Sequence, residues 1–135
     1  MGVRIVRFVN RDICAINDDM QKAYPLFEKC DLLVLASPLY FWTISAQTKS
    51  FIDRLYAISR NDKYPSKETM LLMTCGSEKE YAYDQAESFY QVLLKALEWK
   101  DKGMVLARGV EGKINEKSIE QKYLDDSYQL GKTYQ

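Results

Sequence analysis

The stretch Asp31–Arg54, DLLVLASPLYFWTISAQTKSFIDR, decides the fold of this chain. Its apolar run Leu32–Ala36 has no polar alternation and ends at Ser37-Pro38. Such a run is typical of a strand buried on both faces of a parallel sheet. Three large rings, at positions 40–42, follow at once, and parallel sheets bind their ligands beyond the carboxyl ends of the strands. The stretch therefore predicts an α/β fold with an aromatic platform at one strand end.

Outside this stretch, apolar strands alternate with helical patterns. Strands are expected at Val3–Val9, Leu32–Ser37, Thr69–Thr74 and Met104–Ala107, and helices at about 17–29, 46–57, 77–99 and 117–134. Alternation of this kind implies a parallel sheet with right-handed crossovers. It predicts one domain over residues 1–135, with the first three helices on one face and the last helix alone on the other. Ser77 and Glu80 are spaced as a capping box for the third helix.

Composition restricts the function. Lys+Arg and Asp+Glu both number 19, so there is no excess of basic charge for nucleic acid or an anionic membrane. No apolar run approaches the roughly 20 residues of a membrane span, and no signal-peptide pattern opens the chain. Three scattered cysteines then favour reduced thiols in a cytoplasmic protein.

Histidine is absent from the chain, which has none in 135 residues. Ser-His-Asp and Cys-His chemistry are therefore excluded, and so are zinc sites that need histidine. We predict no metal site. If the protein is an enzyme, it relies on carboxylates, lysines or tyrosines, or on a cofactor that brings its own chemistry, in which case no side chain is catalytic.

Two loops are candidates for ligand binding. The first is the segment Ser37, Pro38, Leu39, Tyr40, Phe41 and Trp42. Its rings fit a planar ligand, but they would equally fill a subunit interface or cap the core. The second is Cys75-Gly76, where glycine lets the backbone approach a ligand at a helix N-terminus, although an ordinary tight turn explains it as well. Adjacent strands would place the two loops side by side.

Other polar residues have simpler explanations. Cys75 resembles a nucleophile near a helix N-terminus, but without histidine a packing role is favoured. Asp18-Asp19 is better explained as a helix cap than as an acid/base pair. Lys113 and Lys117 are spaced to face an anion, yet nothing distinguishes them from solvated surface.

A glycine-rich phosphate loop is missing before the aromatic segment, since no glycine occurs between Gly2 and Gly76. This excludes a standard dinucleotide or nucleoside-triphosphate domain in the N-terminal half.

These motifs resemble the flavodoxin-like NAD(P)H-dependent FMN reductases, and most closely their iron–sulfur flavoprotein branch. The family pattern is a strand ending in S-P-x-Y-F/W and then S-A-Q-x-K-x-F-I-D-R. The chain has it as Ser37–Trp42 and Ser45–Arg54, followed by the Cys75-Gly76 turn. Val3–Val9 resembles the family's second strand, so the chain is similar to a member without the first strand, phosphate loop and first helix.

The resemblance implies a truncated flavodoxin-like sandwich of about four parallel strands with helices on both faces. It implies that Ser37–Trp42 and Cys75-Gly76 contact the ring of FMN, that NAD(P)H donates electrons, and that flavin binding is weak without the phosphate loop. A single Cys14 in place of the cysteine cluster implies no iron–sulfur cluster.

Two other functions remain open. One is a non-catalytic remnant of the family that self-associates and no longer binds FMN. The other is a phosphoacceptor domain, which would need an aspartate where Ser37 and Thr74 end their strands. Whatever the function, the apolar sheet face beside a single C-terminal helix predicts a homo-oligomer, most simply a dimer. Val3–Val9 is expected to pair alongside Leu32–Ser37.

Overall fold

A computed structural model describes residues 14, 16–59, 63–110 and 119–134 of the chain. Its elements, in chain order, are α1 (Met20–Lys29), β1 (Leu32–Pro38), α2 (Ala46–Arg54), the 3-10 turn η1 (Leu55–Ile58), β2 (Glu68–Thr74), the 3-10 turn η2 (Glu80–Tyr83), α3 (Asp84–Leu97), β3 (Lys100–Ala107) and α4 (Gln121–Lys132). The expected strand Val3–Val9 and the two lysines at 113 and 117 lie outside the described residues. No helix in the described ranges is long and apolar enough to cross a membrane.

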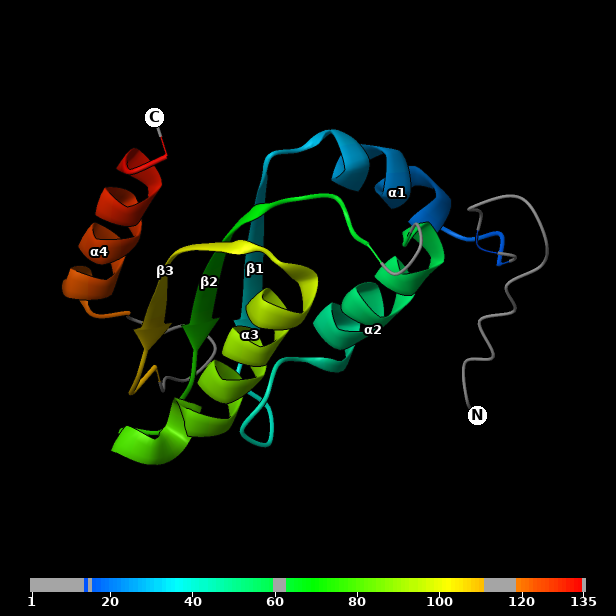
Figure 1. Cartoon of the computed structure of the whole chain (residues 1–135). Helices are drawn as coiled ribbons and strands as arrows, with labels where there is room; N and C mark the ends of the chain where they lie inside the picture. The colour runs from blue at the N-terminus through cyan, green and yellow to red at the C-terminus, as the bar shows by residue number, and fades with distance from the viewer. Residues whose placement is uncertain (1–13, 15, 60–62, 111–118, 135) are drawn as a thin grey trace.

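The described sheet is parallel, with strand order β1-β2-β3. Leu35 of β1 pairs with Leu71 of β2, which pairs with Met104 of β3. Helices α1, α2 and α3 contribute to one buried core on one face of the sheet, while α4 lies on the other side, beside β3 (Figure 1). The predicted α/β order and the division of the helices between the two faces are therefore confirmed for the described residues.

The main core lies between the sheet and α1–α3. Leu35 and Leu71 point into it from the strands and are 4% and 1% exposed. Two buried tyrosines of the α3 region tie the helix layer to the sheet through hydrogen bonds to backbone carbonyls. The Tyr90 hydroxyl lies 2.9 Å from the Thr69 oxygen, and the Tyr83 hydroxyl lies 2.6 Å from the Ala107 oxygen. Both buried hydroxyls therefore have a hydrogen-bond partner, as buried polar groups in folded proteins nearly always do.

The opposite face is only partly covered. No residue of α4 is fully buried, and this helix packs closely over β3, where a Cβ on Gly103 would lie 2.8 Å from Leu130 Cδ1. β1 receives little cover: Val34 is 43% exposed, and Ala36 is also exposed. The prediction that Leu32–Ala36 is buried on both faces is therefore wrong for this side of the strand within one chain.

Two local predictions need correction. Ser77 and Glu80 do not form a capping box, because the Ser77 hydroxyl accepts the Lys79 N–H at 3.2 Å and the helix opens with a 3-10 turn that has no side-chain cap. The third described strand begins at Lys100 rather than at Met104. The pairing of β3 with β2 shifts by one residue just before Gly103, whose φ of +118° suits glycine. Because of this shift, the polar residues that begin β3 still pair with the start of β2.

Candidate functional site at the carboxyl edge of the sheet

A tight hairpin carries the aromatic rings that follow β1. The Tyr40 N–H donates to the backbone carbonyl oxygen of Thr43 at 2.9 Å, and the Thr43 N–H donates back to the backbone carbonyl oxygen of Tyr40 at 3.1 Å. The two residues between them are left-handed, with φ of 47° at Phe41 and 62° at Trp42. Positive φ at both central positions is the geometry of a type I′ turn, which usually takes Asn and Gly. The turn holds two bulky rings in a conformation that they rarely adopt.

The rings of this hairpin are open to solvent. Tyr40, Phe41 and Trp42 are 60%, 91% and 53% exposed, and the Phe41 and Trp42 rings meet edge to face with their centroids 6.1 Å apart. Because they are exposed, these rings do not cap the core of the described chain. A planar ligand or another protein surface remains the available partner.

Ser37 fixes the base of the hairpin. Its buried hydroxyl donates to the Pro38 oxygen at 2.8 Å and accepts the Ser45 N–H at 2.8 Å. The Ser45 hydroxyl in turn caps α2 by accepting the Thr48 N–H at 3.3 Å. The Ser37 side chain thus shapes the loop, since its hydroxyl is already hydrogen-bonded within it.

Backbone hydrogen bonds join the loops that follow all three strands. The Leu39 N–H donates to the backbone carbonyl oxygen of Thr74 at 2.8 Å, which links the hairpin to the end of β2. The Cys75 N–H donates to the Ala107 oxygen at 2.9 Å, and the Val110 N–H donates to the Cys75 oxygen at 2.9 Å. The prediction that the two candidate loops lie side by side is therefore confirmed, and the loop after β3 joins them.

The Cys75-Gly76 turn presents backbone rather than a thiol. Cys75 is 8% exposed, and its Sγ lies 3.3 Å from the backbone carbonyl oxygen of Ser77, whereas Gly76 is partly exposed. The packing role for Cys75 is thus confirmed. Beneath the turn, burial raises the pKa of Tyr83 above its usual value, and the Arg108 guanidinium lies 6.0 Å from the centre of the Tyr83 ring.

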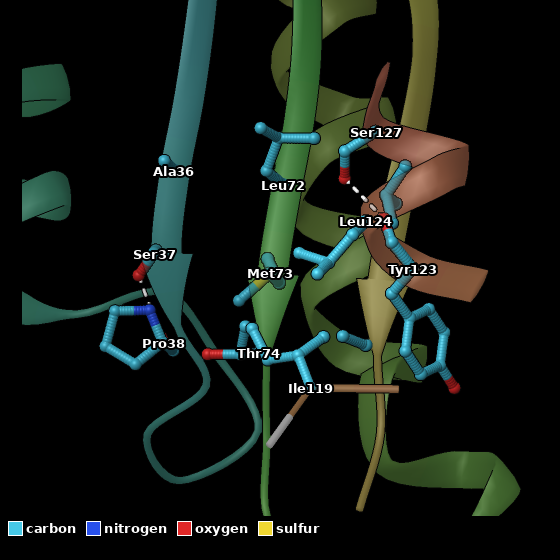
Figure 2. Close-up of a pocket in the computed structure, with 12 residues that line it drawn as sticks. Ala36, Ser37, Pro38, Leu72, Met73, Thr74, Ile119, Tyr123, Leu124 and Ser127 are labelled. Carbon is cyan, nitrogen blue, oxygen red and sulfur yellow. Dashed lines mark hydrogen bonds between the residues drawn. The ribbon is translucent and has the colours of Figure 1, made fainter. Parts of the chain in front are cut away.

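A cavity of about 360 Å³ lies behind these loops, between the strand ends and α4 (Figure 2). The strands and the ends of the loops contribute Ala36, Ser37, Pro38, Leu72, Met73, Thr74, Val105 and Ala107, and the α4 side contributes Ile119, Tyr123, Leu124 and Ser127. None of these described lining residues is charged. The sequence placed Ser37 and Pro38 at a binding site, but it did not show that α4 forms the opposite wall. The spacing of Ile119, Tyr123 and Ser127, each four residues after the last, is a sequence signal that could have shown which side of this segment meets the sheet.

The paired acids Asp18-Asp19 belong to the opposite end of α2 from the hairpin. The Asp18 carboxylate accepts the Met20 N–H at 3.0 Å and forms an ion pair with Arg54. The hydrogen bond from Arg54 holds the pKa of Asp18 below its usual value. The cap interpretation is confirmed for Asp18, while the Asp19 side chain caps nothing and pairs with Lys22 at 2.9 Å.

The fold and this edge define a flavodoxin-like α/β protein, and comparisons with known proteins give the family. Residues 3–107 match the family of NADPH-dependent FMN reductases. The chain therefore belongs to the NADPH-dependent FMN reductase family, whose name implies the use of FMN and NADPH.

Two curated relatives are named iron-sulfur flavoprotein. The protein of Archaeoglobus fulgidus is 45% identical over 42 residues, which are 31% of this chain and 19% of the relative. The protein of Methanosarcina thermophila is 32% identical over 53 residues, which are 39% of this chain and 28% of the relative. The matched segments thus span less than a third of either relative.

Solved structures support the fold. The Trp repressor binding protein from Bacillus subtilis superposes with a TM-score of 0.58 at 18% identity, over 84% of this chain and 72% of that one. An FMN-dependent NADH-azoreductase from Bacillus anthracis, solved in complex with FMN, superposes with a TM-score of 0.62 at 14% identity, over 86% of this chain and 62% of that one. At these identities the likeness concerns the fold alone.

Proposed function

We propose that this chain binds a flavin through the loops after β1 and β2 and serves NAD(P)H-dependent flavin reduction. One observation carries the proposal: an exposed aromatic hairpin stands at the carboxyl edge of the sheet, hydrogen-bonded to the next strand end, beside a cavity whose described lining residues carry no charge. Flat, largely apolar ligands suit such a site. Membership of the FMN reductase family points to the same ligand.

The residues have separate tasks in this proposal. Tyr40 and Trp42 supply ring surface, the Cys75-Gly76 turn supplies backbone groups for the polar edge of the ring, and Ser37 holds the hairpin in place. A flavin held there would supply the redox chemistry, the acceptance of a hydride from NAD(P)H. The protein then orients the ring, and no side chain needs a catalytic role.

The test is flavin binding by the purified chain and by a Trp42→Ala variant. Stacking of aromatic pairs is worth about 0.5–1.5 kcal/mol beyond area burial, so this variant should bind FMN roughly two- to twelvefold more weakly. Tyr56→Ala is the control, because Tyr56 is 40% exposed in η1, outside the loops of the site. Titration calorimetry and the visible absorbance of bound flavin give the readout.

Two outcomes would contradict the proposal. Equal losses in Trp42→Ala and Tyr56→Ala would show that the hairpin is not the binding element. No binding at millimolar FMN would instead favour the alternative of a self-associating family member without flavin.

A further inference from the structure

Arg108 follows the last residue of β3, at the carboxyl edge of the sheet. We propose that its guanidinium donates to the polar edge of a bound flavin ring and stabilises the negative charge that the ring gains on reduction. This inference rests on the proposed function and adds to it the residue that governs how readily the bound ring is reduced.

Backbone hydrogen bonds place Arg108 beside the turn to which we assign the polar edge of the ring. The carbonyl oxygen of the residue before Arg108 accepts the Cys75 N–H at 2.9 Å. The N–H of the residue after Arg108 donates to the backbone carbonyl oxygen of Ser77 at 3.3 Å. Because these two bonds reach the residues on either side of Gly76, the backbone of Arg108 lies next to Gly76.

The Arg108 side chain carries a buried donor without a partner. Its Nε is buried and makes no hydrogen bond, although the residue as a whole is partly exposed. Two other described atoms share this property, the Nε of Arg54 and the hydroxyl of Thr69, and both lie away from this edge, at the far end of α2 and near the start of β2. An unpaired buried donor is costly and calls for a partner such as a bound group. At Arg108, that partner would be a ligand of the Gly76 turn.

The guanidinium is positioned by an aromatic ring. Its Cζ lies 6.0 Å from the centre of the Tyr83 ring, within the range of a cation–π contact. Tyr83 is fully buried and its hydroxyl is hydrogen-bonded to β3, so the ring is a fixed support. Arginine stays positively charged in proteins and presents its N–H donors in one plane. The acid at the same turn, Glu78, is exposed, so solvent screens its charge.

Hydride transfer explains what a cation does at this place. NAD(P)H gives up a hydride, which is one proton with two electrons, and becomes NAD(P)⁺. Uptake of that hydride by a neutral flavin ring adds one negative charge, because no second proton comes with it. Donors that are already aimed at the place where charge develops stabilise it, and charge near the ring nitrogens tunes a flavin. Arg108 forms no covalent bond and moves no proton in this role.

The experiment compares the binding of oxidised and reduced riboflavin by the full chain. Calorimetry gives the dissociation constant of the oxidised form in air, and that of the reduced form after dithionite treatment without oxygen. Arg108→Met keeps the length of the side chain but removes its charge. It should weaken reduced riboflavin about tenfold more than oxidised riboflavin, since a hydrogen bond to a charged group is worth about that much. This ratio corresponds to a midpoint potential lower by about 30 mV for a two-electron couple.

Two variants separate charge from packing. Arg108→Lys keeps the charge and should hold the ratio of the two dissociation constants to within about threefold of the parent's. Lys95→Met removes one positive charge from an exposed position near the end of α3, just before β3 begins, and should leave the ratio unchanged. Urea unfolding of each variant shows whether it is folded.

Several results would overturn the inference and leave the proposed function standing. They are an unchanged ratio in folded Arg108→Met, and an Arg108→Lys protein that behaves like Arg108→Met. A shift that appears with FMN but not with riboflavin would also overturn it, because it would assign Arg108 to the phosphate instead of the ring. If the parent protein binds neither flavin, both the inference and the proposed function fall.

Discussion

Replacing Phe41 by asparagine should stabilise the protein. Phe41 has a φ of 47°, and left-handed backbone costs a bulky residue about 1–2 kcal/mol. Asparagine tolerates this region far better and is a preferred residue at the first central position of such turns. The Phe41 ring is 91% exposed, so its removal forfeits almost no burial. We expect Phe41→Asn to raise the free energy of unfolding by about 1 kcal/mol, or the melting temperature by about 4 °C.

Urea and thermal unfolding followed by circular dichroism measure this effect. The matched control is Tyr81→Asn, because Tyr81 is 59% exposed but lies outside the left-handed region. It should leave stability unchanged or lower it slightly. A Phe41→Asn protein no more stable than the control would refute the idea that the hairpin is strained. A more stable protein that also binds flavin less well would show that the strain serves the site.

Two further predictions concern alkaline pH and assembly. Burial raises the pKa of Tyr24 to about 12 and also raises the pKa values of Tyr83 and Tyr90. The stabilisation from these three tyrosines is complete below pH 10 and is lost above it, so urea midpoints should fall from pH 10 upward; midpoints that stay constant from about pH 9 to about pH 12 would contradict this. We also predict a homodimer at low micromolar concentration in sedimentation velocity, dissociated by Val34→Glu on the exposed outward side of β1; a monomeric parent protein would contradict it.

The parts of the fold that follow from the sequence are those encoded by neighbouring residues. The apolar run that forms β1 and the start of α2 are both local signals, and both were predicted to within a residue or two. The start of β3 was not predicted, because Lys100 and its two neighbours are polar and do not look like a strand. They become part of β3 only because they lie beside β2 in the folded sheet.

The candidate site likewise has a part that could be predicted from the sequence and a part that could not. The order of Ser37 and the aromatic residues predicted a loop at a strand end, since that follows from one segment. The left-handed turn at Phe41 and Trp42 could not be foreseen, because neither glycine nor asparagine marks it. The cavity depends on side chains of α4 that come more than 80 residues after β1, so only the folded chain brings its two walls together.

The two tryptophans lie in different environments, so their fluorescence reports on two different parts of the protein. The chain has two: Trp42 in the hairpin, 53% exposed, and Trp99 in the core, 5% exposed, with its indole N–H bonded to the Pro65 oxygen at 3.0 Å. Emission from Trp42 is accessible to aqueous quenchers, whereas emission from Trp99 is shielded until the core opens. Collisional quenching can thus separate events at the carboxyl edge of the sheet from the integrity of the fold, in one sample and without a label.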